Sequence, residues 1–173
     1  RYQEVIDRYL LDIHPTMLAA LNTRYVIYNG KALPLSQVVG IEPYGAAWFV
    51  ERTVEFSSPK NELEALGNVD LRTIAVVGKG SMATNAIFDT TGSISLVEYA
   101  PNYLRYDYEA SGTGVAVFSE IYYNKGWKAY LDGEEVPYYR ANYILRAMTL
   151  PAGKHTVEWR FRAPAFGRVE AVT

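Results

Sequence analysis

Hydrophobic positions near the start of the chain recur with the spacing of a helix. Between residues 2 and 13, apolar side chains stand three or four positions apart and charged side chains lie between them. This pattern is typical of an amphipathic helix. Pro15 ends that helix, and Thr16 is placed to cap a second short helix that continues to Leu21. The chain therefore begins with two predicted helices.

The pattern then changes to that of strands. Residues 25–28 are apolar or aromatic, an Asn-Gly pair follows at 29–30, and residues 31–33 run from a lysine into apolar side chains. This arrangement predicts a β-hairpin with a type I′ turn, because Asn and Gly tolerate positive φ. Residues 46–56 are a longer apolar and β-branched run, which predicts one strand with a bend near Glu51.

A short helix and another strand come next. Ser58 and Pro59 form an N-cap and first-turn pair, and Gly67 stands where a C-terminal cap belongs. Residues 59–66 are therefore predicted to be helical. Residues 73–77 follow as an almost wholly apolar run, which predicts a buried strand.

From Ser93 onward, almost every segment predicts a strand. Apolar and polar side chains alternate, and turn residues separate the runs at short intervals, as in an antiparallel β-sandwich. In the last run Val157 and Trp159 face one side and Glu158 the other, which indicates a half-buried strand. The predicted strands cover residues 94–99, 103–110, 115–123, 127–131, 136–140, 143–148 and 156–161.

Two turn signals join these strands. Asp132 and Gly133 predict a hairpin turn after the strand at 127–131, because glycine adopts positive φ without strain. The Pro-Ala-Gly sequence at residues 151–153 predicts a second turn, which we expect to close the next hairpin.

The complete pattern predicts a mainly β fold of the α+β class, a jelly-roll-like antiparallel β-sandwich with a helix-containing N-terminal half. We expect residues 1–92 to form a mixed α/β half packed on a sandwich of residues 93–163, with the seam near 78–92. Residues 164–173 are expected to lead into a membrane helix beyond the chain, since Pro164 ends the last strand.

Composition narrows the range of functions. Of the 173 residues, 49% are hydrophobic and 21% charged, as in folded globular proteins, and no apolar run reaches the length of about 18 residues that a bilayer requires. A net charge of -2 argues against a nucleic-acid partner. The absence of cysteine excludes disulfides and thiolate chemistry. His14 and His155 stand far apart without nearby ligands, so we expect neither a metal site nor a cofactor.

Aromatic residues are the compositional exception, with fifteen tyrosines among them. Most fit the half-buried surfaces of a β fold, but aromatic rings also stack on sugars. The candidate sugar platform consists of rings around the turn at 124–126 and two polar residues in apolar surroundings: Tyr122, Tyr123, Trp127, Asn142 and Arg146. The alternative interpretation is structural, with Trp127 in the core and Arg146 paired with a carboxylate such as Glu120.

Catalytic signatures are weak. Residues 77–81 place a lysine between two glycines, without the spacing of a phosphate-binding loop, and no serine lies in a Gly-x-Ser-x-Gly sequence. Asp107, Glu109 and Glu120 lie on predicted strands, and paired carboxylates could support glycoside hydrolysis. Because carboxylates on strands are most often solvated, we expect no catalysis by this chain.

Four ordered motifs stand in the second half of the chain: Phe118-Ser-Glu-Ile-Tyr-Tyr123, Gly126-Trp-Lys-Ala-Tyr-Leu-Asp-Gly133, Arg140-Ala-Asn-Tyr-Ile-Leu-Arg-Ala147 and Pro151-Ala-Gly-Lys-His-Thr-Val157. In this order they resemble the C-terminal extracytoplasmic part of the YfhO family of bacterial membrane proteins. Two earlier stretches, at residues 21–27 and 47–50, are similar to further signatures of that family.

The resemblance implies a role in the cell envelope. It implies a multi-spanning protein similar to glycosyltransferases that use lipid-linked sugar donors, with family members connected to the glycosylation of envelope polymers such as lipoteichoic acid. Their catalytic acids lie in loops of the membrane part, so none is carried over to this chain. The expected function is a non-catalytic, extracytoplasmic accessory domain whose partners are the membrane part of the same polypeptide and an envelope glycan or lipid-linked sugar. The alternatives are an independent carbohydrate-binding module and a glycoside-processing enzyme.

Overall fold

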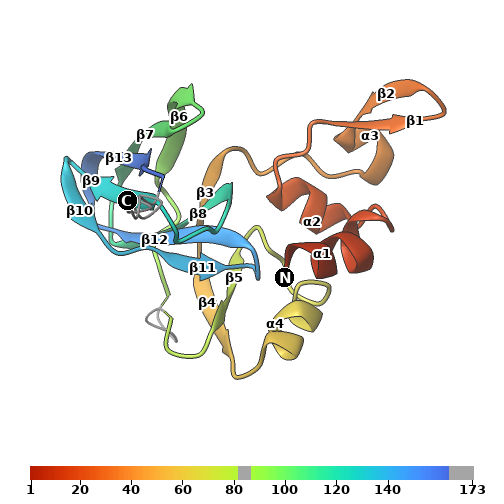
Figure 1. Cartoon of the computed structure of the whole chain (residues 1–173), viewed down its shortest axis with the longest axis horizontal. Helices are drawn as coiled ribbons and strands as arrows, with labels where there is room; N and C mark the ends of the chain where they lie inside the picture. The colour runs from red at the N-terminus through yellow and green to blue at the C-terminus, as the bar shows by residue number, and fades with distance from the viewer. Residues whose placement is uncertain (82–86, 164–173) are drawn as a thin grey trace, which may run out of the picture.

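The computed structural model describes residues 1–81 and 87–163, and these residues are mostly strand, which confirms the predicted mainly β class (Figure 1). Two large sheets pack face to face in a sandwich-like arrangement. The five-stranded sheet is antiparallel, in the order β10 (Glu134–Val136), β9 (Trp127–Leu131), β13 (Gly153–Phe161), β7 (Tyr103–Ala110) and β6 (Ser93–Ala100).

The six-stranded sheet is mixed. Only its β4–β5 pair is parallel among the strand pairs within the described residues. Its order is β3 (Ala47–Val50), β8 (Gly114–Ile121), β12 (Leu145–Leu150), β11 (Tyr139–Ala141), β5 (Ile74–Gly78) and β4 (Arg52–Phe56). Of these six strands, β3, β4 and β5 precede residue 92, and β8, β11 and β12 follow it. The expected sandwich of residues 93–163 is too narrow, because β3 pairs with β8 and completes the sheet.

This sheet is strongly curled at the chain segment that contains β3 and β4. The two strands lie at opposite edges of the sheet, yet only Glu51 separates them in sequence. A flat sheet of this size would place its edges roughly 24 Å apart, at about 4.8 Å per strand spacing, so the sheet curls until its edges meet. The predicted bend at Glu51 is therefore correct, but the strand on each side of it has its own partner.

The six-stranded sheet has a hydrophobic core on each of its faces, because neighbouring residues of a strand point to opposite sides. Trp48 packs on the side of the N-terminal helices, together with Val117 and Leu145. Phe49 packs toward the five-stranded sheet, together with Phe118 and Trp159. The molecule therefore has three layers: helices, curled sheet and five-stranded sheet (Figure 1).

The first helical segment differs from the prediction of one α-helix through residue 13. It consists of α1 (Tyr2–Val5) followed by a π-helical turn (Ile6–Leu10). The wider turn is closed by the bond from the Leu11 amide to the Ile6 carbonyl, at 3.1 Å. Tyr9 lies on this turn and donates to the carbonyl of Leu63 at 2.6 Å. The wide turn thus aims a buried tyrosine at the helix α4 (Pro59–Ala65).

Two predicted helix caps are wrong. Thr16 lies inside α2 (Pro15–Ala20), because Pro15 occupies the first turn and His14 becomes the N-cap. At the end of α4 (Pro59–Ala65), Gly67 lacks positive φ, and a Cβ there would lie 3.2 Å from the Tyr9 ring. The glycine therefore serves close packing rather than a left-handed cap. The Ser58 cap is confirmed, since its hydroxyl accepts from the amide of residue 61 at 3.2 Å.

The predicted hairpin turns are confirmed where positive φ is needed. Asn29 and Gly30 join β1 (Tyr25–Tyr28) to β2 (Lys31–Pro34), and Asp132 and Gly133 join β9 to β10, all with positive φ. The sequence analysis missed α3 (Leu35–Val39), a single turn of helix without a side-chain cap.

The strands predicted at 136–140 and 143–148 are partly wrong. Pro137 has no amide to donate, and it separates β10 in one sheet from β11 in the other. Tyr143 has positive φ and belongs to the turn before β12. The turn at 151–153 connects the two sheets rather than closing a hairpin. Pro164 and the expected lead-in at 164–173 lie outside the described residues.

Candidate functional site

The five residues of the candidate sugar platform do not form one exposed surface. Tyr123 is 49% exposed, whereas Tyr122 and Trp127 are partly buried. The Tyr122 ring lies 5.3 Å from the ring of Tyr138, and the Trp127 ring lies 5.4 Å from that of Phe161. Two of the three rings are therefore engaged by neighbouring side chains. A sugar-binding role for these residues stays a prediction.

Asn142 is fully buried and completes the backbone pairing of the six-stranded sheet. Its side-chain oxygen accepts from the backbone amide of Val76 at 2.9 Å, and its backbone amide donates to the Val76 carbonyl at 2.7 Å. Because both contacts are part of the junction between β5 and β11, the observed role of Asn142 is to join two strands.

Arg146 lies between two tryptophan rings inside the sandwich. Its guanidinium carbon is 4.4 Å from the centre of the Trp127 ring and 4.8 Å from that of Trp159. The side chain is 2% exposed, and Nε donates to the carbonyl of Ile121 at 3.1 Å. The expected direct partner, Glu120, acts at longer range: burial raises the pKa of its carboxyl, and Arg146 opposes that shift. Aromatic faces rather than a carboxylate hold this cation.

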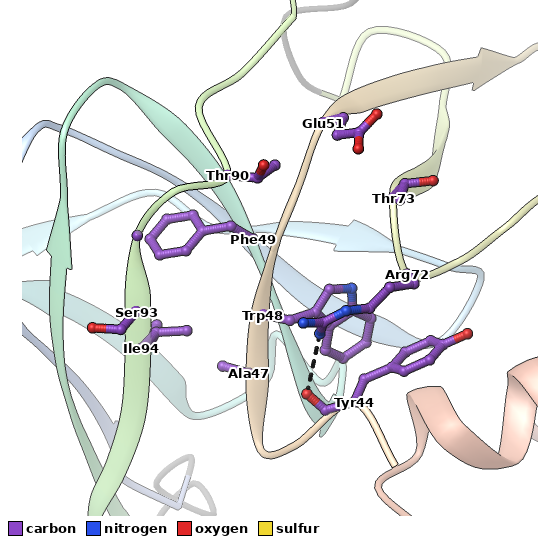
Figure 2. A pocket seen from close by; sticks show the side chains of 11 residues that line it. Tyr44, Ala47, Trp48, Phe49, Glu51, Arg72, Thr73, Thr90, Ser93 and Ile94 are labelled. Carbon is purple, nitrogen blue, oxygen red and sulfur yellow. Dashed lines mark hydrogen bonds between the residues drawn. The ribbon is translucent and has the colours of Figure 1, made fainter. Parts of the chain in front are cut away.

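A cleft of about 400 Å³ lies beside β3 (Figure 2). Figure 2 shows Phe49 pointing toward Ser93 and Ile94, while Trp48 points to the other side of the strand. Trp48 is 2% exposed, and its indole nitrogen donates to the Leu71 carbonyl at 3.1 Å. The aromatic rings of the cleft wall are thus packed against the protein itself.

The open rim of this cleft carries opposite charges. Arg72 donates to the carbonyl of Tyr44 at 3.4 Å, and its guanidinium carbon lies 5.7 Å from the Tyr44 ring (Figure 2). Glu51 lines the same cleft and is exposed. Since the deep rings are committed to packing, this cleft offers a ligand only a short polar rim.

The larger candidate site is a groove of about 480 Å³ on the five-stranded sheet, called here the polar groove. It is formed where β6, β7 and β13 run side by side at the tip of the β9–β10 hairpin. Carboxylates, hydroxyls, an ammonium group and an imidazole line it: Ser93, Ser95, Asp107, Tyr108, Glu109, Asp132, Lys154, His155 and Thr156.

Antiparallel pairing positions these groups. Ser95 stands opposite Asp107 on β7, and Asp107 stands opposite Thr156 on β13. The hydroxyl of Thr156 donates to Asp107 at 3.0 Å, and Lys154 forms an ion pair with Glu109 at 3.2 Å. Asp107 and Glu109, considered as catalytic carboxylates from the sequence, thus share one surface. Glu120 instead lies near Arg146.

His155 closes one end of the groove. Its Nδ1 lies 2.6 Å from the Asp132 carboxylate, and its Nε2 lies 3.0 Å from the carbonyl of Ala152. Both neighbours are acceptors, so the doubly protonated imidazolium satisfies both contacts. The Ala152 carbonyl and then Asp132 raise the pKa of His155 above its ordinary value of 6.5. His155 therefore has one backbone partner, the Ala152 carbonyl, and one side-chain partner, Asp132.

Asp132 is held as a carboxylate. Its second oxygen accepts from the amide of Thr156 at 2.9 Å, and this bond, followed by the one to His155, lowers the pKa of the Asp132 carboxyl. The sequence analysis assigned Asp132 only to the hairpin turn. Its role in the groove depends on the register between β9 and β13, which no local pattern displays.

These contacts predict a pH-dependent contribution of His155 to stability. A histidine with a raised pKa in the fold stabilises it below about pH 6.5, and this contribution disappears as the pH rises through the folded pKa. We expect His155→Gln to lower the unfolding temperature at about pH 5.5 and to change it much less at about pH 8.5. Thermal unfolding of both proteins across this range is the measurement.

His14 supplies the matched control for that experiment. Burial lowers the pKa of His14, so its protonation opposes folding at low pH. His14→Gln should therefore show the opposite trend relative to the parent protein. Equal effects of His155→Gln at both pH values would mean that its imidazole is not charged in the folded protein.

Comparison with known protein families decides the assignment of the chain. The sequence model of the bacterial membrane protein YfhO matches residues 66–173, more than half of the chain. The chain belongs to the YfhO family. The matched YfhO segment includes β5 to β13 and thus the whole polar groove, whereas β3 and β4 precede it. No match was found among curated proteins or solved structures.

Within residues 1–81 and 87–163, no helix is both long enough and apolar enough to cross a bilayer. The described residues of this YfhO-family chain form the two-sheet sandwich and the helices packed on it.

Proposed function

We propose that this chain is a non-catalytic, extracytoplasmic domain of a membrane protein that takes part in the glycosylation of cell-envelope glycans or glycolipids. We further propose that the polar groove contacts the glycan. The glycosylation role and the extracytoplasmic side rest on the resemblance described for the sequence motifs. The polar groove is the observation that carries the glycan contact.

The lining of the groove fits a sugar better than an apolar ligand. Carboxylates accept hydrogen bonds from sugar hydroxyls, while the serine and threonine hydroxyls and Lys154 can donate to sugar oxygens. Tyr108 lies beneath this lining: it is 4% exposed, its ring packs 6.1 Å from that of Phe49, and burial raises the pKa of its phenol to about 12. A volume of about 480 Å³ lies within the range of small-ligand sites.

The charge state of the groove favours binding over glycoside hydrolysis. Hydrolysis by two carboxyl groups requires one of them to stay protonated as a general acid, with a raised pKa. In the groove, Asp132 has a lowered pKa, Glu109 is paired with Lys154, and Asp107 is paired with Arg105 at 3.3 Å. Each of these three acids is thus already paired with a cationic or imidazole side chain of the chain itself.

Titration calorimetry with envelope polysaccharides and their fragments tests the proposal. Asp107→Asn removes the central charge of the groove and should weaken binding about tenfold, equivalent to one charge-assisted hydrogen bond. Glu135→Gln alters an exposed charge on β10, outside the groove lining, and should leave affinity unchanged.

Two results would contradict this proposal. Loss of binding in Tyr123→Ala with none in Asp107→Asn would assign the glycan to the aromatic platform. Release of sugar from a panel of glycosides, abolished by one carboxylate substitution, would make the chain an enzyme.

A further inference from the structure

The β1–β2 hairpin stands away from the rest of the molecule. Figure 1 shows it projecting beyond the helical layer, with α3 as its neighbour and both sheets at a distance. Two-stranded hairpins are marginally stable alone in water. An isolated hairpin that persists on the surface therefore suggests a contact beyond this chain.

One face of this hairpin has no charged side chain. In the antiparallel register, Tyr25 is opposite Pro34 and Ile27 is opposite Ala32, so these four residues share a face. Tyr25 is 64% exposed and Ile27 is 78% exposed, whereas Tyr28, 60% exposed beside the turn, is opposite Lys31 on the other face. Large apolar side chains are seldom gathered on a solvent-exposed surface without a binding role.

The hairpin itself carries only positive charge. Arg24 precedes β1, Lys31 begins β2 opposite Tyr28, and residues 24–41 contain no acidic residue; the exposed Glu42 follows and lines a hollow with Arg24 and Tyr25. This segment thus carries a charge of +2 in a chain whose net charge is -2. A surface with a negatively charged outer layer over an apolar interior would complement this segment in both charge and hydrophobicity.

We propose that the β1–β2 hairpin docks on an anionic lipid bilayer. Ile27 and Ala32 enter the boundary of the acyl chains, and the tyrosines lie at the headgroup level that aromatic side chains prefer. Arg24 and Lys31 bind lipid phosphates while their aliphatic stems cover apolar surface. Membership of a membrane-protein family places a bilayer near this chain. The proposal is independent of the glycan proposed for the groove.

The charge of the hairpin disfavours a second copy as the occupant of this face. Pairing of two hairpins would bring together two copies each of Arg24 and Lys31 with two copies of Glu42, so cations would stay in excess. A bilayer of anionic lipid avoids this repulsion and gains from each cation.

Vesicle flotation of this chain tests the proposal. We expect binding to vesicles of phosphatidylcholine mixed with phosphatidylglycerol, weaker binding to phosphatidylcholine alone, and loss of binding at high salt. Lys31→Gln should lower the partition coefficient about fivefold. Ile27→Asp should abolish flotation.

Control variants separate docking from damage to the fold. Tyr99→Ser changes another exposed tyrosine, 71% exposed on β6, and should leave flotation intact. Ile27→Asp should keep the parent unfolding temperature, because neither core contains Ile27. If that variant fails to fold, Tyr25→Ser alters the same face, supplies the same comparison and should weaken flotation.

Three outcomes would overturn the proposal. The first is absence of flotation with anionic vesicles, which would leave the face to the membrane-spanning part of the polypeptide. The second is equal flotation of the parent and Ile27→Asp. The third is a dimer in light scattering that Ile27→Asp dissociates, which would assign the face to a second copy.

Discussion

Trp159→Ala is expected to lower the free energy of unfolding by about 3–5 kcal/mol. Trp159 is fully buried between the two sheets, where its ring lies 5.1 Å from that of Phe118 and 4.9 Å from that of Tyr138. Truncation removes apolar burial and leaves a cavity that strands on both sides cannot fill. Chemical denaturation followed by circular dichroism measures the loss.

A matched substitution at the surface tests whether burial is the cause. Tyr99→Ala also removes a large ring, but that ring is 71% exposed, so stability should change by less than about 0.5 kcal/mol. A loss at Trp159 no larger than that at Tyr99 would mean that the Trp159 ring does not fill the core.

Arg146→Ala is expected to cost about 2–5 kcal/mol, while Arg146→Met should cost much less. Alanine leaves a gap between the Trp127 and Trp159 rings, whereas methionine keeps the length of the stem. Arg146 Nη1 has no hydrogen-bond partner among the described residues. In Arg146→Met, loss of the cation–π contacts destabilises the fold, while removal of the unpaired buried donor stabilises it. The two changes in the free energy of unfolding therefore partly cancel.

Urea unfolding of both variants separates packing from charge at this position. Arg160→Ala is the control, because Arg160 lies 4.2 Å from the Tyr130 ring but is exposed, and its loss should cost no more than about 1 kcal/mol. The pKa of Glu120 should rise further in both Arg146 variants, since Arg146 is the group that lowers it. Equal losses for Ala and Met would show that charge, not packing, sets the cost.

Local chemistry in the sequence was enough to predict turns and strand types. Asn29, Gly30, Asp132 and Gly133 adopt the positive φ that their dipeptides predict. These features depend only on neighbouring residues, as does the Ser58 cap. The mainly β class follows for the same reason, because alternation along a strand is a local property.

Features that depend on pairing partners could not be predicted in this way. The apolar run at 46–56 contains no signal that its halves lie at opposite edges of one sheet. Arg146 in an apolar strand suggested a carboxylate partner, whereas the fold supplies two tryptophans from the opposite sheet. The polar groove likewise combines β6, β7 and β13 through their register.

The meeting of both sheet edges at Glu51 also determines what can be cut from this chain. A fragment that begins at residue 66, where the family match begins, lacks β3 and β4. It would expose the unpaired backbone edges of β8 and β5, together with the apolar faces that the N-terminal helices cover. We therefore expect the segment that matches the family model to be less stable by itself than within the complete sheet. During synthesis, β3 likewise leaves the ribosome well before its partner β8, so its backbone edge stays unpaired until β8 has emerged.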